Sequence, residues 1–326
     1  MSHRITKSVF IIIAPFLVIG CIEHTFFIHI QPNGDFKMEY TASGDKMDIL
    51  NSDFPIPTGT DWIISSTLDL PDIETPEYSA KRVFGNGEPV PDSFFTNDSI
   101  YPSSLIRHPL SVKYRNWWIK EIYEFSMVFN SRKVGEKYPK MAKNFEKGAG
   151  EEGWLKEVLV YLFNETLTRS ITGFNREPVI RKELESWLAE NVVNHPDSIL
   201  LENWAFLKKG GMDVLIQTIE PDSYSKMDSI FKVLEDEAKI TMKLVDDIFE
   251  LSVVMPGELG ISNADTTKGD TMTWIFKISS YQDDDFAMMA RSSISHAGRY
   301  YFLVGLFIVA LIGILLSYNR TGSAHH

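Results

Sequence analysis

The stretch that decides the fold runs from Tyr114 to Asn130 and reads YRNWWIKEIYEFSMVFN. Apolar residues occupy alternate positions along most of it, which is typical of a β-strand with one buried face. The apolar face comprises Trp117, Ile119, Tyr123, Phe125, Met127 and Phe129 and is interrupted by Glu121, whereas Lys120, Glu124 and Ser126 lie on the other face. The pattern predicts one strong strand over about 114–130.

Directly after this stretch the period changes from two to that of a helix, and it stays helical from about 133 to 237. The helical spacing is carried by Trp154, Leu155, Val158, Leu159 and Leu162, by Ile180, Leu184, Trp187 and Leu188, by Leu200, Leu201, Trp204 and Leu207, and by Met227, Ile230, Phe231 and Leu234. We interpret these residues as core rather than as a ligand site. The pattern predicts a helical block of roughly a hundred residues.

Strand patterns flank the helical block on both sides. Thr25–Ile30 and Phe36–Tyr40 surround a turn cluster at Pro32–Asp35 and predict a hairpin. Further strands are predicted at Trp62–Leu68, Lys239–Leu244, Ile248–Met255, Met272–Ile278 and Phe286–Ile294. The fold class is therefore α+β, with a mostly antiparallel sheet and a helical insertion at about 133–237. Residues 22–299 form either one elaborated domain or a β domain with an inserted helical unit.

The first twenty residues predict a lipoprotein signal peptide, with Arg4 and Lys7 ahead of an apolar run from Val9 to Ile19. Leu17-Val18-Ile19-Gly20-Cys21 resembles the lipobox of bacterial lipoproteins. The resemblance implies that Cys21 becomes the first mature residue and carries a diacylglycerol. The alternative is an ordinary buried cysteine in a signal or anchor helix.

The segment Tyr301–Tyr318 contains no charged residue over 18 positions. As a helix it would be about 27 Å long, close to the thickness of the bilayer hydrocarbon, and tyrosines stand at both edges. It predicts a transmembrane helix followed by a short cytoplasmic tail, 319–326. The alternative, a buried helix of a soluble core, would show a polar stripe, and this segment has none.

The chain of 326 residues has 32 Lys and Arg against 44 Asp and Glu, a net charge of -12. This balance argues against nucleic acid as a partner, and a single cysteine excludes a disulfide framework and a multi-thiolate zinc site. The exported part, 22–299, has 29 basic and 44 acidic residues. We expect it to lie on the extracytoplasmic face of the cell membrane, to be repelled by anionic lipid headgroups, and to bring its first and last strands to the same membrane.

The segment Val253–Ala264 and the following Gly269–Trp274 resemble a pattern in bacterial lipoproteins of the LppM type. The resemblance implies a sheet-plus-helix domain that binds a lipid or envelope ligand, with one C-terminal transmembrane helix and no catalysis. The residues themselves favour structural roles: Pro256 and Gly257 set a turn, Asn263 bonds to backbone, and Trp274 fills the core.

No catalytic, metal or cofactor site is predicted. The chain has no nucleophile elbow, phosphate loop or dinucleotide motif. His24, His29, His108, His195 and His296 form no ligand pair and are predicted at the surface, and Asp283–Asp285 is interpreted as a charged turn between strands.

Three functions stay open. The first is a non-enzymatic envelope lipoprotein that binds a lipid-like or apolar ligand, or a partner protein, near the membrane. The ligand form of this hypothesis predicts an apolar pocket between the sheet and the helices. The second is a scaffold or accessory subunit of a membrane complex that docks through an acidic helical block. The third is an envelope hydrolase with dispersed carboxylates.

Overall fold

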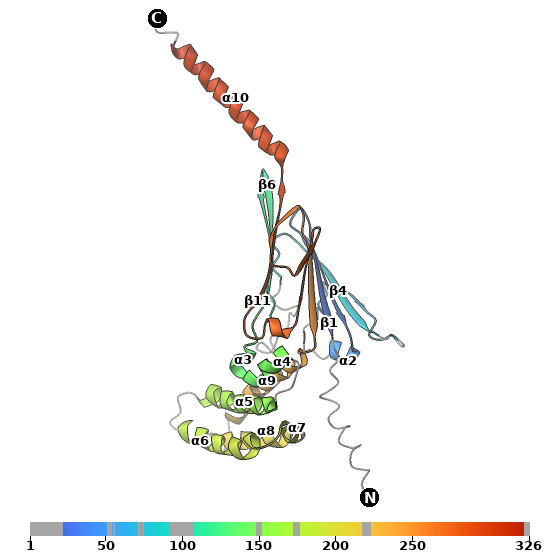
Figure 1. The fold of residues 1–326 in the computed structure, drawn as a ribbon, viewed down its shortest axis with the longest axis vertical. Coiled ribbons are helices and arrows are strands. Elements are labelled where there is room, and N and C mark those ends of the chain that lie inside the picture. The colour runs from blue at the N-terminus through green and yellow to red at the C-terminus, as the bar shows by residue number, and fades with distance from the viewer. Residues whose placement is uncertain are drawn as a thin grey trace.

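The computed structural model describes residues 22–50, 54, 56–70, 73, 75–90, 107–147, 152–171, 177–216 and 223–322. It shows a body of two β-sheets with a block of helices at one end and a long C-terminal helix leaving the other end (Figure 1). The α+β class is thus confirmed.

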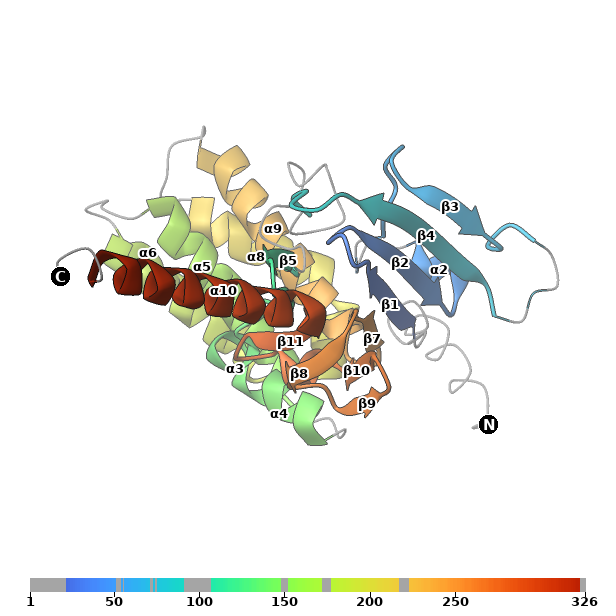
Figure 2. The ribbon, with the colours of Figure 1, turned by 90° about the horizontal axis from the view of Figure 1, so that it is seen from above.

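The larger sheet has seven strands in the order β3-β4-β2-β1-β7-β10-β9. Their bounds are β1 Glu23–Ile30, β2 Phe36–Ser43, β3 Ile63–Ser66, β4 Glu77–Phe84, β7 Ile248–Val254, β9 Thr266–Lys268 and β10 Thr271–Phe276. The predicted hairpin is present as β1 and β2, and β4 and β3 extend the sheet from it (Figure 2). Strand β1 also pairs in parallel with β7, so strands from the two ends of the chain meet at the centre of the sheet.

The smaller sheet has four antiparallel strands in the order β5-β6-β11-β8, with bounds Leu110–Trp117, Lys120–Phe129, Phe286–Ser295 and Glu258–Ser262. The prediction of one long strand over 114–130 is wrong, because the chain turns at Trp118 and Ile119 and forms the β5–β6 hairpin. Alternation of period two does not reveal a reversal when the residues at the turn are themselves apolar.

The apolar faces of the two sheets pack against each other and form the first core. Phe129 of β6 lies 6.2 Å from Phe26 of β1 and 5.6 Å from Phe249 of β7, measured between ring centroids, and Phe125 lies 6.1 Å from Trp274. Two sheets with facing apolar sides replace the single sheet that we predicted.

The helical block lies between β6 and β7 and has its own core. It contains α3 Val134–Lys137, α4 Pro139–Lys147, α5 Trp154–Ile171, α6 Glu177–Leu188, the π-helical turn η1 Ala189–Val193, α7 Asp197–Glu202, α8 Trp204–Ile216 and α9 Ser223–Lys243. The strand predicted at Lys239–Leu244 is wrong, because α9 runs through to Lys243. The buried residues Phe231, Leu234 and Ala238 continue a helical period up to Leu244. Two short helices lie in the β-body, α2 Lys46–Ile49 and the 3-10 turn η2 Ile278–Ser280.

The first and last strands begin at the same end of the body and run in the same direction. Ile22, just before β1, bonds to Asp247 at the end of the helical block. Strand β11 starts at Phe286, which pairs with Phe129 of β6, and Phe129 in turn packs against Phe26 near the start of β1. Strand β11 then leads away into α10, Ala297–Gly322 (Figure 1). Ile22 and α10 therefore lie at opposite ends of the body, which contradicts the expectation that the first and last strands bring their outer ends to the same membrane.

Candidate functional site

Of the predicted site residues, Cys21 lies outside the described residues, as does the signal segment 1–20. Pro256 and Gly257 form the turn between β7 and β8. Gly257 has φ 82°, and a Cβ at this position would overlap the backbone of Ser293. The Ser292 hydroxyl donates to the Pro256 carbonyl over 2.8 Å. This turn thus lies directly against β11.

Asn263 connects the two sheets. Its Oδ1 accepts from the indole N–H of Trp274 over 3.1 Å and from the backbone N–H of Met289 over 2.7 Å, and its Nδ2 donates to the Ala287 carbonyl. Trp274 belongs to the larger sheet and is buried, whereas Met289 and Ala287 belong to β11 of the smaller sheet. Packing and hydrogen bonding alone thus explain the presence of Asn263 and Trp274 at these positions.

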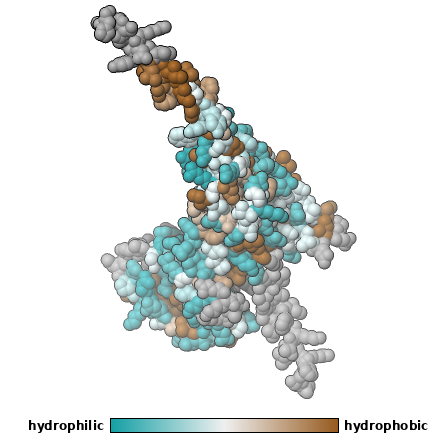
Figure 3. Space-filling model, turned by 45° about the horizontal axis from the view of Figure 1, so that its top comes forward, coloured by the Kyte–Doolittle hydropathy of each residue, from teal (hydrophilic) through white to brown (hydrophobic). Residues whose placement is uncertain are grey.

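Helix α10 is the most exposed apolar element among the described residues. The segment Ala297–Leu315 has a mean hydropathy of 2.0 and is not buried at all against the body. In Figure 3 it projects from the body as a continuous hydrophobic surface. The helix begins four residues before the predicted Tyr301 and ends four after Tyr318, at Gly322.

A polar clamp joins the start of α10 to the tip of the β5–β6 hairpin. The His296 backbone N–H donates to the Ile119 carbonyl, and the Arg299 guanidinium donates to the Trp118 carbonyl over 2.8 Å. His296 Nε2 and a Glu121 carboxylate oxygen are also 2.8 Å apart. The hydrogen bond from His296, followed by one from the Tyr123 hydroxyl, holds the pKa of Glu121 below its usual value.

Sequence reasoning missed this clamp because it treated Glu121 as an interruption of an apolar face. A carboxylate at the centre of an otherwise apolar strand face was the signal available, since such a group requires a partner.

His24 is buried, so its predicted surface position is wrong. Its Nδ1 lies 2.8 Å from the Tyr40 hydroxyl and its Nε2 lies 3.3 Å from a carboxylate oxygen of Asp247. The other oxygen of Asp247 accepts from the backbone N–H of Ile22. The cluster fixes the start of β1 beside the end of the helical block.

His108 is also buried, against the rings of Phe26, Phe54 and Phe129, which again contradicts the surface prediction. Burial disfavours the charged imidazolium and lowers the pKa of His108 to about 4. His29, His195 and His296 are partly buried. Of these three, His296 belongs to the clamp, through its contact with Glu121.

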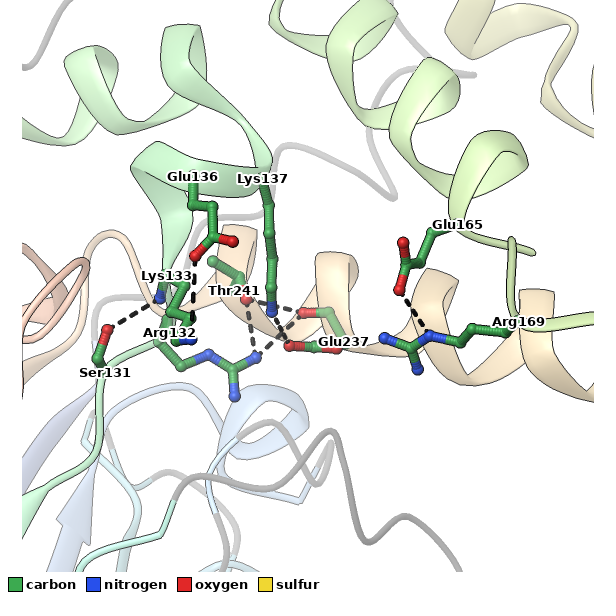
Figure 4. Close-up of polar contacts among 9 residues, drawn as sticks. All are labelled: Ser131, Arg132, Lys133, Glu136, Lys137, Glu165, Arg169, Glu237 and Thr241. Carbon is green, nitrogen blue, oxygen red and sulfur yellow. Dashed lines mark hydrogen bonds and ion pairs between the residues drawn. The ribbon is translucent and has the colours of Figure 1, made fainter. Parts of the chain in front are cut away.

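A second polar cluster connects the β-body to the helical block (Figure 4). The buried Arg132 donates from Nη2 to the Thr241 hydroxyl over 2.8 Å and to the Glu237 carbonyl over 3.3 Å. Lys137 pairs with the Glu237 carboxylate over 2.5 Å. These contacts link the chain leaving β6 to the last turns of α9.

The acidic run Asp283–Asp285 lies between η2 and β11 and contributes to the same connection. Asp283 accepts from the Gly135 backbone N–H, and Asp285 accepts from the Ser131 backbone N–H over 2.7 Å. The predicted charged turn is present, although it follows a 3-10 turn rather than a strand.

Two hollows stand out, and both lie in the helical block. One is an apolar cavity of about 30 Å³ among Trp154, Leu201, Trp204 and Met242, with Glu235 and Lys239 at its side. The other is an open hollow of about 370 Å³ lined by Lys182, Glu183, Ser186, Trp187, Glu190 and Val214. Neither lies between the sheets and the helices, where the ligand hypothesis places a pocket.

Among the described residues, no group of three or more His, Cys, Asp or Glu side chains has the arrangement of a metal site. The buried carboxylate of Glu235 instead accepts from Lys208, Lys239 and the Trp204 indole, and so belongs to the packing of the helical block.

No protein-family model matches the chain, and no curated protein matches its sequence. Among solved structures, the chain is similar to the folded domain of LppM from Mycobacterium tuberculosis, determined by NMR. The match has a TM-score of 0.29 and 11% sequence identity, and covers 84% of this chain and 90% of that one. This is a weak likeness, and no residue role passes from one protein to the other.

Proposed function

We propose that the protein is a non-enzymatic envelope protein that α10 anchors in the cell membrane. In this proposal the body, residues 22–296, lies on the extracytoplasmic face and binds a partner protein through its helical block. The observation that carries the anchoring is the complete exposure of an apolar helix beside a body whose other apolar elements bury their faces in two cores.

The length of α10 supports a membrane-spanning role. Ala297–Leu315 comprises 19 residues, which as a helix reach about 28 Å and match a hydrocarbon core of about 30 Å. A helix of a soluble core would bury at least one face, whereas this one buries none.

The hollows favour a protein partner over an enclosed lipid-like ligand. A cavity of about 30 Å³ has room for about two water molecules, because one water needs roughly 10–15 Å³ of such space. The open hollow beside Trp187 is lined mainly by polar and charged side chains, which suits a protein surface better than an acyl chain. Residues 133–243 hold 19 acidic and 16 basic residues, so the net charge of the helical block is small. Net charge is therefore not the basis on which the block binds its partner in this proposal.

The anchoring is tested by extraction of membranes with alkaline carbonate. A Cys21→Ser chain whose residues 1–20 are replaced by an ordinary cleavable signal peptide should carry no lipid label yet stay in the membrane pellet, because α10 suffices as an anchor. The same variant with Val309→Lys and Ile312→Lys should appear in the supernatant, since each charge at the centre of a membrane helix costs about 2.5–3.5 kcal/mol. Release of the Cys21→Ser protein without the lysines would contradict the proposal.

Sidedness is tested with a membrane-impermeant maleimide in intact cells, on the Cys21→Ser background. Lys268→Cys, on the exposed strand β9, should be labelled, and Ser323→Cys in the predicted cytoplasmic tail should react only after permeabilisation. The reverse pattern would place the body in the cytoplasm.

The partner is tested by crosslinking on intact membranes before solubilisation. A photoreactive residue at Glu190, on the rim of the open hollow, should yield one reproducible adduct, and the same residue at Lys268 of the β-body should not. Absence of any adduct from several positions around this hollow would contradict a docking role of the helical block.

A further inference from the structure

The tip of the β5–β6 hairpin is a cluster of exposed apolar side chains. Trp117 is 64% exposed, Trp118 48% and Ile119 39%. Two neighbouring indoles and an isoleucine at a hairpin tip are costly to leave in water, so a surface of this kind marks a contact with something apolar.

This tip lies beside α10 rather than elsewhere on the body. The clamp of His296 and Arg299 holds the tip carbonyls at the start of the helix. The rings of Trp118 and Phe302 are in edge-on contact with centroids 6.1 Å apart. Phe302 is the sixth residue of α10, so the indole reaches about 7 Å along the helix from its first residue.

Aromatic residues of α10 lie at the same level as the tip. Tyr300 and Tyr301 are exposed at the first turns of the helix, and their rings lie 5.9 Å apart. Trp and Tyr are the residues that gather where bilayer hydrocarbon meets headgroups, because each ring is apolar and carries one polar group.

The charge at this end is opposite in sign to that of the whole chain. Residues 115–121 and 294–299 contain three basic residues, Arg115, Lys120 and Arg299, and one acidic residue, Glu121, which is paired with His296. Arg115 is neutralised by its ion pair with Glu124, so Lys120 and Arg299 carry the positive charge at this end. Basic side chains next to a bilayer attract anionic headgroups. The general repulsion expected from the net charge of the exported part therefore does not apply at this end.

We infer that the β5–β6 hairpin tip inserts Trp117, Trp118 and Ile119 into the interface of the bilayer that α10 crosses. The inference rests on the proposed anchoring by α10 and adds a second contact, which fixes the orientation of the body on the membrane. Phe206 of α8 is also exposed and apolar, but it lies on the helical block, at the far end of the body from α10 (Figure 1).

The test uses the full chain in phosphatidylcholine–phosphatidylglycerol vesicles, with Cys21→Ser as background. A single cysteine labelled with an environment-sensitive fluorophore is placed at Asn116, next to the tip, at Val309, in the middle of α10, or at Phe206. All three positions are exposed, and Asn116→Cys leaves both indoles in place. Lipids spin-labelled near the headgroup or near the chain end then report depth by quenching.

The expected result is quenching at Val309 by the deep label, quenching and a blue shift at Asn116 by the shallow label, and neither at Phe206. Adding Trp117→Ser and Trp118→Ser should abolish the signal at Asn116 and leave that at Val309. Quenching at Val309 without any at Asn116 would overturn the inference while α10 remains an anchor. No quenching at Val309 would overturn the anchoring itself.

A folding defect is separated from a loss of membrane contact by circular dichroism of the serine variants. Retained secondary structure with loss of the Asn116 signal supports the inference. An unchanged Asn116 signal in the folded double variant would overturn the role of the two indoles.

Discussion

Asn263 shows how much one side chain contributes at the residue scale, because its three hydrogen bonds join strands of both sheets. Asn263→Ala leaves the buried Trp274 indole N–H and the Met289 N–H without this acceptor. We expect a loss of about 1–2 kcal/mol in the free energy of unfolding, since each net hydrogen bond contributes about 1 kcal/mol. Denaturant unfolding in detergent measures it, with Asn116→Ala as an exposed control, and equal stability of the two variants would contradict the role.

His108 predicts an acid sensitivity of the β-body. Its pKa is about 4 in the folded state against 6.5 in the unfolded chain, so the unfolded state binds the extra proton as the pH falls. Well above pH 6.5 the group is neutral in both states and there is no penalty. Between pH 7 and pH 5 the folded state should lose about 2 kcal/mol through this group.

The measurement is the unfolding free energy at the two pH values for wild type and His108→Phe. The phenylalanine fits a site already lined by Phe26, Phe54 and Phe129 and cannot be protonated. The pH dependence should shrink by the stated amount, and the same pH dependence in both proteins would contradict the assignment.

The positions of the histidines were partly predictable from the sequence. His24 has the same strand parity as Phe26, Ile28 and Ile30, so alternation alone places it in the core, whereas His29 falls on the other face. The prediction that His24 lies at the surface relied on the polarity of histidine and not on its position in the strand. The acceptor for His24, Asp247, is 223 residues away and no local pattern reveals such a pair.

At the element scale, α9 is stabilised by a buried carboxylate. Burial alone would raise the pKa of Glu235, but hydrogen bonds from Lys239 and Lys208 outweigh it and lower the pKa. Glu235→Gln leaves two ammonium groups and the Trp204 indole with a weaker partner. We expect about 2–3 kcal/mol less stability of the helical block.

Helical circular dichroism during urea unfolding measures this loss, with Glu185→Gln on the exposed face of α6 as the matched control. Because the pKa of Glu235 is lowered on folding, its contribution should be present above the pKa of the unfolded chain and be lost as the pH falls through the lowered value. A loss no larger than that of the control would contradict the role of the buried carboxylate.

Helices and strands were predictable where the spacing of apolar residues had an unambiguous period. The hairpin of β1 and β2, the helices of the block and strand β11 follow from local spacing. The segment Lys239–Leu244 has residues that favour strands, but it continues the helical period of α9. Its helical form buries Ile240 and Leu244 in the core of the β-body, so tertiary packing outweighs local propensity. The reversal at Trp118 and Ile119 was not predictable because its apolar tip continues the strand pattern.

At the scale of the whole molecule, two cores meet at Phe145, which packs against both, and the polar contacts of Arg132 and Asp283 reinforce this junction. Arg132→Met removes the bonds to Thr241 and Glu237 while keeping the length of the side chain. We expect the single unfolding transition to separate into two, because the helical block then loses its coupling to the β-body. Calorimetry distinguishes these cases, and a single transition in the variant would show that the junction is not the coupling element.

The overall arrangement depended on strand pairing that the sequence does not display. The parallel pairing of β1 with β7 joins residues more than two hundred positions apart, and it determines which end of the body holds Ile22. The long apolar helix α10 could be predicted from composition, but its position relative to Ile22 could not.

The placement of Ile22 and α10 at opposite ends of the body determines how far the helical block lies from the membrane. Strand β11 alone has ten residues, about 33 Å at 3.3 Å per residue, and it separates the hairpin tip from the end of the body that holds Ile22. With the tip at the bilayer, as we infer, the body would stand upright and hold the helical block away from the membrane. An acyl group on Cys21, which the lipobox resemblance predicts, would instead draw the opposite end of the body toward the bilayer. Energy transfer from a bilayer dye to the helical block tests this prediction, because an acylated chain should then hold the block closer to the membrane than the Cys21→Ser chain does.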